Sequence, residues 1–496
     1  MSPTTSPSSV RIQYPPGFRA RRGLNWGFLG LLYTSFYMCR YNLSIANKAI
    51  SEEFGFSRSD MGAIITTSLL AYACGQIING LLTDRLGGKR GMLIGATGTI
   101  IMNVLFGAAS MWGTLRPEAA AGAAAQSPWV VNLGFLHLGL FVPLLTMFVV
   151  IRGIDGYLQS FGSPGMVKIN TAWFGQLERG RFAGIFGFMI NLGRFGIFKI
   201  GPAMLAGFTF LGMWHVSPLH WRWLFWIPAC LCALIAIGMA LTVKETPEEA
   251  GFHGAHPGEA DHADDGVRAP FSVVLKTIAM NPMVWIVALA YACTGAVRQG
   301  VDQWFPRFLQ EVHGFDYTMK EFQFFGVTVH SNPFTVIGFL IPFVASVGSL
   351  ASGYISDTVF KGRRAPVAAG LYFLETTVIL LAAQFHSAGA AIVFLVLISL
   401  TANSTHSILG TAAAMDIGGR KMAGFASGLI DSFQYFGGSL AGYFLGQLLD
   451  KSWGYYFYFM APFGFVGGLL MLTIRGKITG QARKEALPVA PLNAGP

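Results

Sequence analysis

Residues 80–90 read GLLTDRLGGKR and residues 353–364 read GYISDTVFKGRR, so the chain carries the same short pattern twice. Each copy has a small residue that can pack at a helix end, then an acid, then a tight basic turn. The two copies follow long apolar runs at matching places in the two halves of the chain, which predicts a fold built from two similar halves. The charged residues of the two turns are candidate gating residues: Asp84, Arg85, Lys89, Arg90, Asp357, Lys361, Arg363 and Arg364.

The composition places the chain in a membrane. Of its 496 residues, 53% are hydrophobic and only 12% are charged, with a mean hydropathy of +0.51. Soluble domains carry about 25% charged residues, so most of this surface cannot face water. The formal charge of +10 is scattered between apolar runs rather than gathered on one element, which argues against nucleic-acid binding. We therefore expect a lipid bilayer, and no nucleic acid, around this protein.

Apolar runs long enough to cross a bilayer divide the chain into two sets of six. A polar stretch at 244–281 separates the sets, so we expect a cytoplasmic tail at 1–23, a six-helix bundle at 24–243, a cytoplasmic linker at 244–281, a second bundle at 282–474 and a cytoplasmic tail at 475–496. The fold class is thus all-α, with twelve transmembrane helices. The predicted spans are 24–46, 59–84, 90–112, 130–174 (long and broken), 180–208, 221–243, 282–311, 332–356, 366–386, 388–412, 423–448 and 453–474.

The distribution of basic residues predicts the orientation. If both termini are cytoplasmic, the segments on that side hold 21 of the 34 Lys and Arg residues and those on the other side hold 7. This bias is typical of cytoplasmic loops, so we expect a multi-pass protein of the cell inner membrane with both termini inside. The five cysteines lie in apolar runs without ligand spacing, so no disulfide, metal or cofactor is expected.

Two arginines lie where a bilayer should exclude charge. Arg40 and Arg298 are each 16 residues into the first span of their half, so repeat symmetry would place them face to face across a central cleft. An arginine at a helix centre costs about 2.5–3.5 kcal/mol on insertion scales, which makes such a residue functional by default. Few acids lie nearby, and guanidinium groups suit phosphate or carboxylate in bidentate geometry. The alternative, that each arginine snorkels or bonds a backbone carbonyl, stays open.

Other polar residues of the spans have less specific interpretations. Arg152 has Asp155 three residues later, which favours a local ion pair. Lys168 follows the helix-breaking residues 162–165 and could be a third anion contact. Three tyrosines at mid-span depth could donate to phosphate oxygens or could simply pack: Tyr37, Tyr72 and Tyr435.

Three titratable residues could couple transport to a second ion. Asp302 lies four residues after Arg298 and could pair with it until an anion arrives. Asp431 could carry a proton by titrating within the membrane. His406 has a suitable intrinsic pKa for a proton relay, although a lone helical histidine is often only hydrogen-bonded.

Several motifs together resemble the organophosphate:phosphate antiporter family of the major facilitator superfamily. They are YMCRYN at 37–42, FSRSDMG at 56–62, QSFGSP at 159–164, QLERG at 176–180, TPEEAGF at 246–252, Arg298 with Trp304, and Ala423 through Ser439. The resemblance implies a major facilitator fold, transport of glycerol-3-phosphate, hexose phosphates or phosphoglycerates, and exchange for inorganic phosphate. It also implies that Arg40 and Arg298 clamp phosphate and that Lys168 matches a basic family position.

The chain departs from the family pattern at the supporting charges. Relatives have Lys where this chain has Tyr41, Asp where it has Gln303 and Lys where it has Gln76; a family Glu aligns with Pro342 and a His with Ala172. We therefore expect Gln76 and Gln303 to line the substrate site in place of charged residues. The two-arginine clamp itself is retained.

These observations predict a secondary transporter that moves a phosphorylated small metabolite by alternating access. Two alternatives stay open: a proton-coupled symporter of another organic anion that uses Asp431 or His406, and a transporter-like hexose-phosphate sensor. An enzyme is not expected, because no nucleophile motif, phosphate-binding glycine loop or metal-ligand cluster is present in the sequence. We expect a monomer whose partners are an anionic organophosphate and inorganic phosphate.

Overall fold

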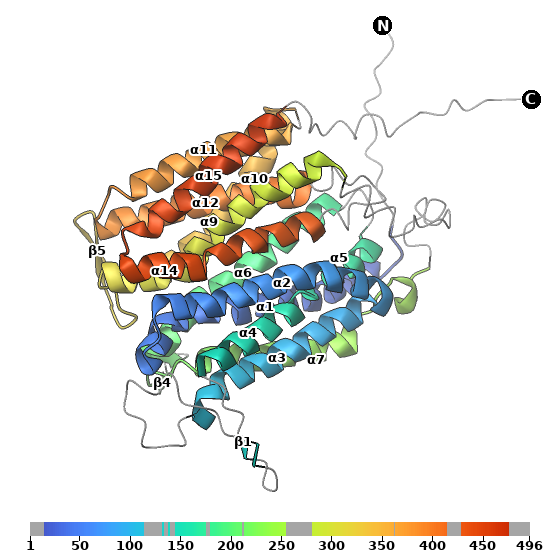
Figure 1. The fold of residues 1–496 in the computed structure, drawn as a ribbon. Coiled ribbons are helices and arrows are strands. Elements are labelled where there is room, and N and C mark those ends of the chain that lie inside the picture. Colours follow the sequence, from blue (N-terminus) through green and yellow to red (C-terminus); the bar gives the residue numbers. More distant parts are fainter. Residues whose placement is uncertain are drawn as a thin grey trace, which may run out of the picture.

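The computed structural model describes residues 14–113, 131–132, 137–138, 144–174, 179–210, 213–253, 280–361, 363–413 and 428–475. Long helices run side by side through this part of the chain, and the remaining elements are short hairpins and helical turns (Figure 1). Helices suit this sequence because an α-helix satisfies its own backbone hydrogen bonds, which lipid cannot do.

The first half of the chain forms seven helical segments. Helix α2 begins with a capping box, in which the Ser57 hydroxyl accepts from the Asp60 amide and the Asp60 carboxylate accepts from the Ser57 amide. The left-handed Gly55 ends the preceding helix. The segments are α1 (Phe18–Phe54), α2 (Arg58–Leu86), α3 (Gly88–Gly113), α4 (Leu144–Gln159), α5 (Gly162–Trp173), α6 (Arg179–Ala206) and α7 (Trp223–Thr242).

The second half repeats this pattern. Its first two helices each begin with an asparagine cap followed by proline, a combination that favours helix initiation. The segments are α9 (Pro282–Val312), α10 (Pro333–Thr358), α11 (Arg364–Ala382), α12 (Ala388–Ser407), a π-helical turn η5 (Ile408–Ala413), helical residues 428–440, α14 (Tyr443–Lys451) and α15 (Tyr455–Thr473), preceded by the short 3-10 turn η3 (Glu248–Ala250).

Three antiparallel two-stranded hairpins complete the described elements. They pair β1 (Val131–Asn132) with β2 (His137–Leu138), β3 (Phe208–Phe210) with β4 (Trp214–Val216), and β5 (Phe322–Phe324) with β6 (Val327–Val329).

The helices correspond to the twelve predicted spans when α4 is counted with α5 and residues 428–440 are counted with α14. Within the described ranges, eight helices are long and apolar enough to cross a membrane by length and composition. The span predicted at 130–174 is broken, as expected: residues 131–132 and 137–138 pair as strands, and the described helices α4 and α5 are separated at residues 160–161.

The helices form two groups that pack against each other. Figure 1 shows α9 to α15, in yellow to red, above α1 to α7, in blue to green. Glycines allow close approach both within and between the groups: a Cβ on Gly295 would lie 1.8 Å from the Gln434 carbonyl, and a Cβ on Gly62 would lie 2.5 Å from the Gly442 carbonyl. Small residues at such crossings are typical of membrane helices.

Polar contacts join the two groups at one end of the molecule, away from the basic turn at residues 87–90. There the Arg58 guanidinium at the start of α2 forms an ion pair with Glu311 near the end of α9. Asp450 accepts from the backbone amides of Arg58 and Ser59 at 2.8 and 2.9 Å. Arg307 donates to the Asn47 side chain at 2.8 Å. This set, which we call the outer latch (Arg58, Glu311, Asp450, Arg307 and Asn47), holds that end closed.

Candidate functional site

Arg40 lies deep in α1, and its side chain is only 4% exposed. Its Nε donates to the Gln159 side chain at 3.1 Å, and one terminal nitrogen donates to the Tyr435 hydroxyl at 3.0 Å. The other terminal nitrogen, NH2, is buried without a hydrogen-bond partner in the described structure. Arg40 thus has neutral partners, and a buried charged donor remains free for an anion.

Three tyrosine rings surround the Arg40 guanidinium. The guanidinium carbon lies 4.6 Å from the Tyr37 ring centre, 4.2 Å from that of Tyr72 and 5.7 Å from that of Tyr435. The rings of Tyr72 and Tyr435 are 4.2 Å apart, and the Tyr72 hydroxyl is buried with no partner in the described structure. The rings stabilise the cation without neutralising it.

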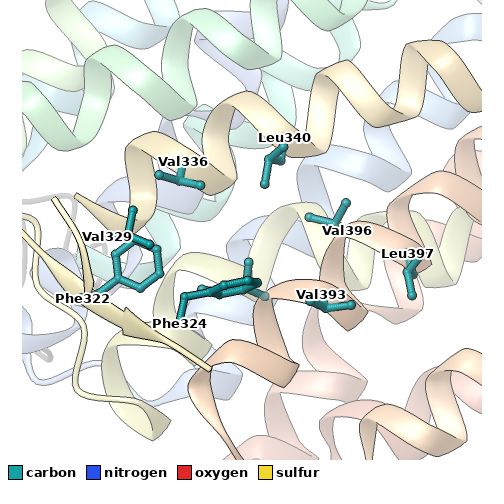
Figure 2. Close-up of a pocket in the computed structure, with 9 residues that line it drawn as sticks. Phe322, Phe324, Val329, Val336, Leu340, Val393, Val396 and Leu397 are labelled. Atoms are coloured by element: carbon teal, nitrogen blue, oxygen red, sulfur yellow. The ribbon is translucent and has the colours of Figure 1, made fainter. Parts of the chain in front are cut away.

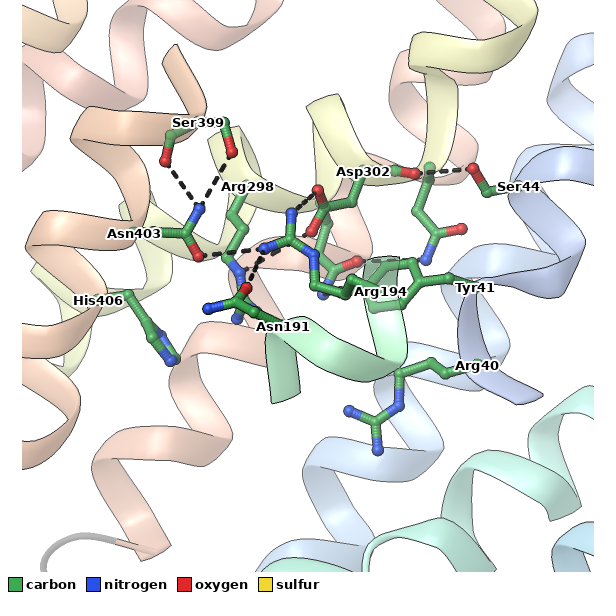
Figure 3. Close-up of polar contacts among 12 residues, drawn as sticks. Arg40, Tyr41, Ser44, Asn191, Arg194, Arg298, Asp302, Ser399, Asn403 and His406 are labelled. Atoms are coloured by element: carbon green, nitrogen blue, oxygen red, sulfur yellow. Dashed lines mark hydrogen bonds and ion pairs between the residues drawn. The ribbon is translucent and has the colours of Figure 1, made fainter. Parts of the chain in front are cut away.

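Arg298 lies at the corresponding depth of α9 and is 2% exposed. No hydrogen bond from its guanidinium to another described residue is present, and its Nε is buried without a hydrogen-bond partner. Tyr37 and Tyr435 act electrostatically on both Arg298 and Arg40, which places the two arginines around the same cluster of rings. Figure 3 shows both guanidiniums in the interior between helices of the two groups.

Asp302 has a different main partner from the one predicted. Its carboxylate lies 3.9 Å from the Arg298 Nε, which is an ion-pair distance but not a hydrogen bond. The short contact is with Arg194 of α6, a fully buried residue that also donates to Asn191 and Asn403 (Figure 3). Asp302 therefore forms the predicted ion pair with Arg298 at the long end of the ion-pair range, and it makes a closer contact with Arg194, which the sequence did not predict.

The structure does not bring Lys168 to the arginines. Its Nζ donates to the backbone carbonyls of Thr83 and Asp84 at 3.0 and 2.8 Å. The ammonium group thus binds carbonyls of the last turn of α2, where a cation is also favoured by the helix dipole. This corrects the prediction of a third anion contact, because the break before α5 turns Lys168 toward α2.

Gln76 and Gln303, which stand where relatives have charged residues, lie in different places in the structure. Gln303 is buried and donates to Gln299 at 3.2 Å, and Gln299 in turn donates to the Tyr41 hydroxyl at 3.4 Å. Gln76 instead donates to the Asp431 carboxylate across the interface between the groups. Only Gln76 therefore makes a direct contact with a charged residue.

The two basic turns lie at the end opposite the outer latch. Asp84, Arg85 and Arg90 are exposed, whereas Lys89 donates to the Ala240 carbonyl at 2.8 Å. In the second copy Arg364 donates to the Ser356 hydroxyl at 3.0 Å, Lys361 has a positive φ of 53°, and Arg363 is exposed at the start of α11. The side chain of Asp357 lies outside the described residues. The described contacts of these turns stay within one group of helices.

The two remaining titratable candidates, His406 and Asp431, meet around Tyr291 of α9. The Tyr291 hydroxyl lies 2.5 Å from His406 Nδ1 and donates to Asp431 at 3.5 Å. Asp431 also accepts from Gln76 of α2. We call these four residues, His406, Tyr291, Asp431 and Gln76, the polar chain. Tyr291 lies seven residues before Arg298 and was not predicted as a site residue, because nothing in the sequence distinguishes it from a packing tyrosine.

One apolar cavity lies away from the arginines. It has a volume of about 360 Å³ and lies between the β5–β6 hairpin, α10 and α12, where Figure 2 shows hydrophobic side chains all around it. No charged residue lines it, so it does not suit an anion. No group of three or more potential metal ligands occurs in the described part of the chain.

Residues 29–442 of the chain match the family profile described as Major Facilitator Superfamily. The chain belongs to this superfamily. A solved bacterial homologue of the human lysosomal transporter Spinster, inward-facing and unoccupied, superposes with a TM-score of 0.66 at 17% identity over 93% of this chain and 99% of that chain, which confirms the predicted major facilitator fold and a multi-pass membrane protein.

Several relatives of this chain are named for phosphate esters. The glycerol-3-phosphate transporter of Bacillus subtilis is 25% identical over 90% of this chain and 88% of its own length. A probable hexose phosphate transport protein of Chlamydia trachomatis is 25% identical over 88% and 86%. The membrane sensor protein UhpC of Escherichia coli is 24% identical over 92% and 91%. These relatives confirm the resemblance predicted from the motifs.

Proposed function

We propose that this protein is a secondary transporter of phosphorylated small metabolites and not an enzyme. The observation that supports this most is the state of the two arginines: both are buried, Tyr37 and Tyr435 act electrostatically on both, and Arg40 keeps a terminal nitrogen without a hydrogen-bond partner in the described structure. A phosphate oxygen would satisfy that donor and the unbonded Arg298 guanidinium together. The names of the relatives support a small organophosphate as substrate.

Binding at these arginines would connect the two halves of the transporter. Arg40 belongs to the first bundle, which we keep at 24–243, and Arg298 belongs to the second, at 282–474. A phosphate group bridging them neutralises both charges and lets the bundles rock about the site. An empty site with two facing cations resists closing, so return is favoured only with a second anion, such as inorganic phosphate. We therefore propose exchange, in a monomer of the inner membrane with both termini cytoplasmic.

The predicted orientation assigns the outer latch to one side of the membrane. The outer latch closes the end away from the basic turns, and Arg58 and Glu311 hold it across the two bundles. With the orientation predicted from the basic residues, the end joined by the outer latch is the external one.

A panel of phosphate esters in a thermal-shift assay tests the proposal. A ligand that binds only the folded state stabilises it by about 2.7 kcal/mol at a hundredfold excess over Kd. We expect inorganic phosphate and at least one of glycerol-3-phosphate, glucose-6-phosphate or 3-phosphoglycerate to raise Tm, and the matched non-phosphorylated alcohols to leave it unchanged. Equal shifts with and without the phosphate group would refute it.

A hexose-phosphate sensor is a second candidate, because the similarity to the membrane sensor protein is as extensive as that to the transporters. Both functions require the same binding site. Uptake by purified protein in liposomes separates them, since a sensor binds the ester without accumulating it.

A further inference from the structure

We propose that Asp431 binds a proton when the phosphate ester binds, so that the dianion and one proton occupy the transporter together. This inference rests on the proposed function and deepens it by naming the co-transported ion. Its basis is the position of Asp431, which belongs to the polar chain and lies beside the arginine site.

The charged groups around the site set up the need for a proton. Arg194 and Asp302 neutralise each other in a contact between α6 and α9. Asp302 also lies 3.9 Å from Arg298, but with its charge balanced by Arg194 the described acid that is left to balance Arg40 and Arg298 is Asp431, which makes no ion pair with a described residue and lies in the field of both guanidiniums. The empty site therefore carries one net positive charge.

A bound dianion reverses this balance. A phosphate monoester with a second pKa of about 6 is a dianion at pH 8, and it would leave the site with one net negative charge. In the empty site the positive field of Arg40 and Arg298 stabilises the ionised form of Asp431. The bound anion cancels this field, so protonation of Asp431 becomes more favourable. Asp431 should then take a proton from hydronium, forming an O–H bond and releasing water, and the loaded site becomes neutral. Neutrality favours movement of the site through a medium of low dielectric constant.

The polar chain gives that proton a hydrogen-bonded route. Asp431 and His406 are both partly exposed, and the Tyr291 hydroxyl lies between them, 2.5 Å from His406 Nδ1 and 3.5 Å from the Asp431 carboxylate. The groups facing Asp431 are Gln76 and Tyr72 from α2, Tyr291 and Arg298 from α9, Arg40 and Tyr33 from α1, and Tyr435 from its own helical segment. Among these described neighbours Gln76 donates a hydrogen bond and no second acid competes for the proton.

Calorimetry in two buffers of different ionisation enthalpy tests this directly. The wild-type protein is titrated at pH 8 with glycerol-3-phosphate and with inorganic phosphate, and the difference in heat gives the protons taken up. We expect uptake of about one proton per bound ester in the wild type, none in Asp431→Asn, and uptake again in Asp431→Glu. The matched control is Glu375→Gln, which changes a fully buried acid of α11 and should leave the uptake at the wild-type value.

The outcomes separate this inference from the proposed function. Binding by the wild type without proton uptake, or equal uptake by Asp431→Asn, overturns the proton site and leaves the phosphate site standing. No binding of any ester or of phosphate by folded wild-type protein overturns both. Folding of each variant is checked by its elution profile and Tm before titration.

Discussion

Replacing Arg40 by lysine tests whether its guanidinium geometry, and not only its charge, serves the anion. In the structure the guanidinium Nε donates a hydrogen bond to Gln159 and one terminal nitrogen donates to Tyr435. The second terminal nitrogen has no hydrogen-bond partner among the described residues. A lysine ammonium cannot reproduce this fork, so the Arg40→Lys variant should lose one charge-assisted hydrogen bond to phosphate.

The expected loss is large enough to measure. A hydrogen bond to a charged group contributes about 1.5–3 kcal/mol, and a tenfold change in Kd corresponds to about 1.4 kcal/mol. Arg40→Lys should therefore weaken the binding of glycerol-3-phosphate and inorganic phosphate by roughly 10- to 150-fold in calorimetric titration.

A matched control makes the comparison specific. Arg222→Lys applies the same chemical change to an arginine at the start of α7, away from the arginine site. Arg222 pairs with Glu53 at 2.8 Å, and its replacement should leave the Kd for both anions unchanged. If Arg40→Lys binds both anions within about threefold of the wild type, where the fork should cost about 1.5 kcal/mol or more, the assignment of Arg40 to the phosphate site is refuted.

Three further predictions concern the contacts between the helices. Asp302→Asn leaves the Arg194 charge buried without its acid, so it should lower stability by about 3–5 kcal/mol, seen as a lower Tm; an unchanged Tm would contradict the ion pair. Gly295→Val should prevent correct packing, because even a Cβ would lie 1.8 Å from a facing carbonyl, and normal yield of monodisperse protein would count against this crossing. Glu311→Gln weakens the outer latch at Arg58, so a cysteine label placed at that end should react faster than in the wild type; equal labelling rates would show that the latch does not hold the end closed.

The depth and pairing of charges along single helices could be predicted from the sequence. Arg40 and Arg298 both lie buried at mid-span, and Arg152 forms the predicted pair with Asp155 at 2.9 Å. These results follow from helical periodicity, since residues three or four apart share a face. The twelve helical spans could also be predicted, because the length of each apolar run can be counted in the sequence and compared with the thickness of a bilayer.

Contacts between distant helices could not be predicted in the same way. Asp302 of α9 contacts Arg194 of α6, which is 108 residues away in the chain. Gln159 supports Arg40 from 119 residues away. The contact of Lys168 could not be predicted either. The direction of its side chain depends on how α5 is rotated about its axis after the break, and the spacing of residues along the chain does not specify that rotation. Such pairings depend on helix rotation and crossing, which a single sequence does not encode locally.

Exchange in liposomes tests the role of the two arginines most directly. Purified protein is reconstituted, and the uptake of labelled inorganic phosphate is measured with vesicles that contain unlabelled phosphate and with vesicles that contain none. A site of two facing cations that moves only when loaded predicts rapid uptake into the phosphate-loaded vesicles, little uptake into the others, and loss of both in Arg298→Lys. Equal uptake into both kinds of vesicle, or full exchange by Arg298→Lys, would contradict it.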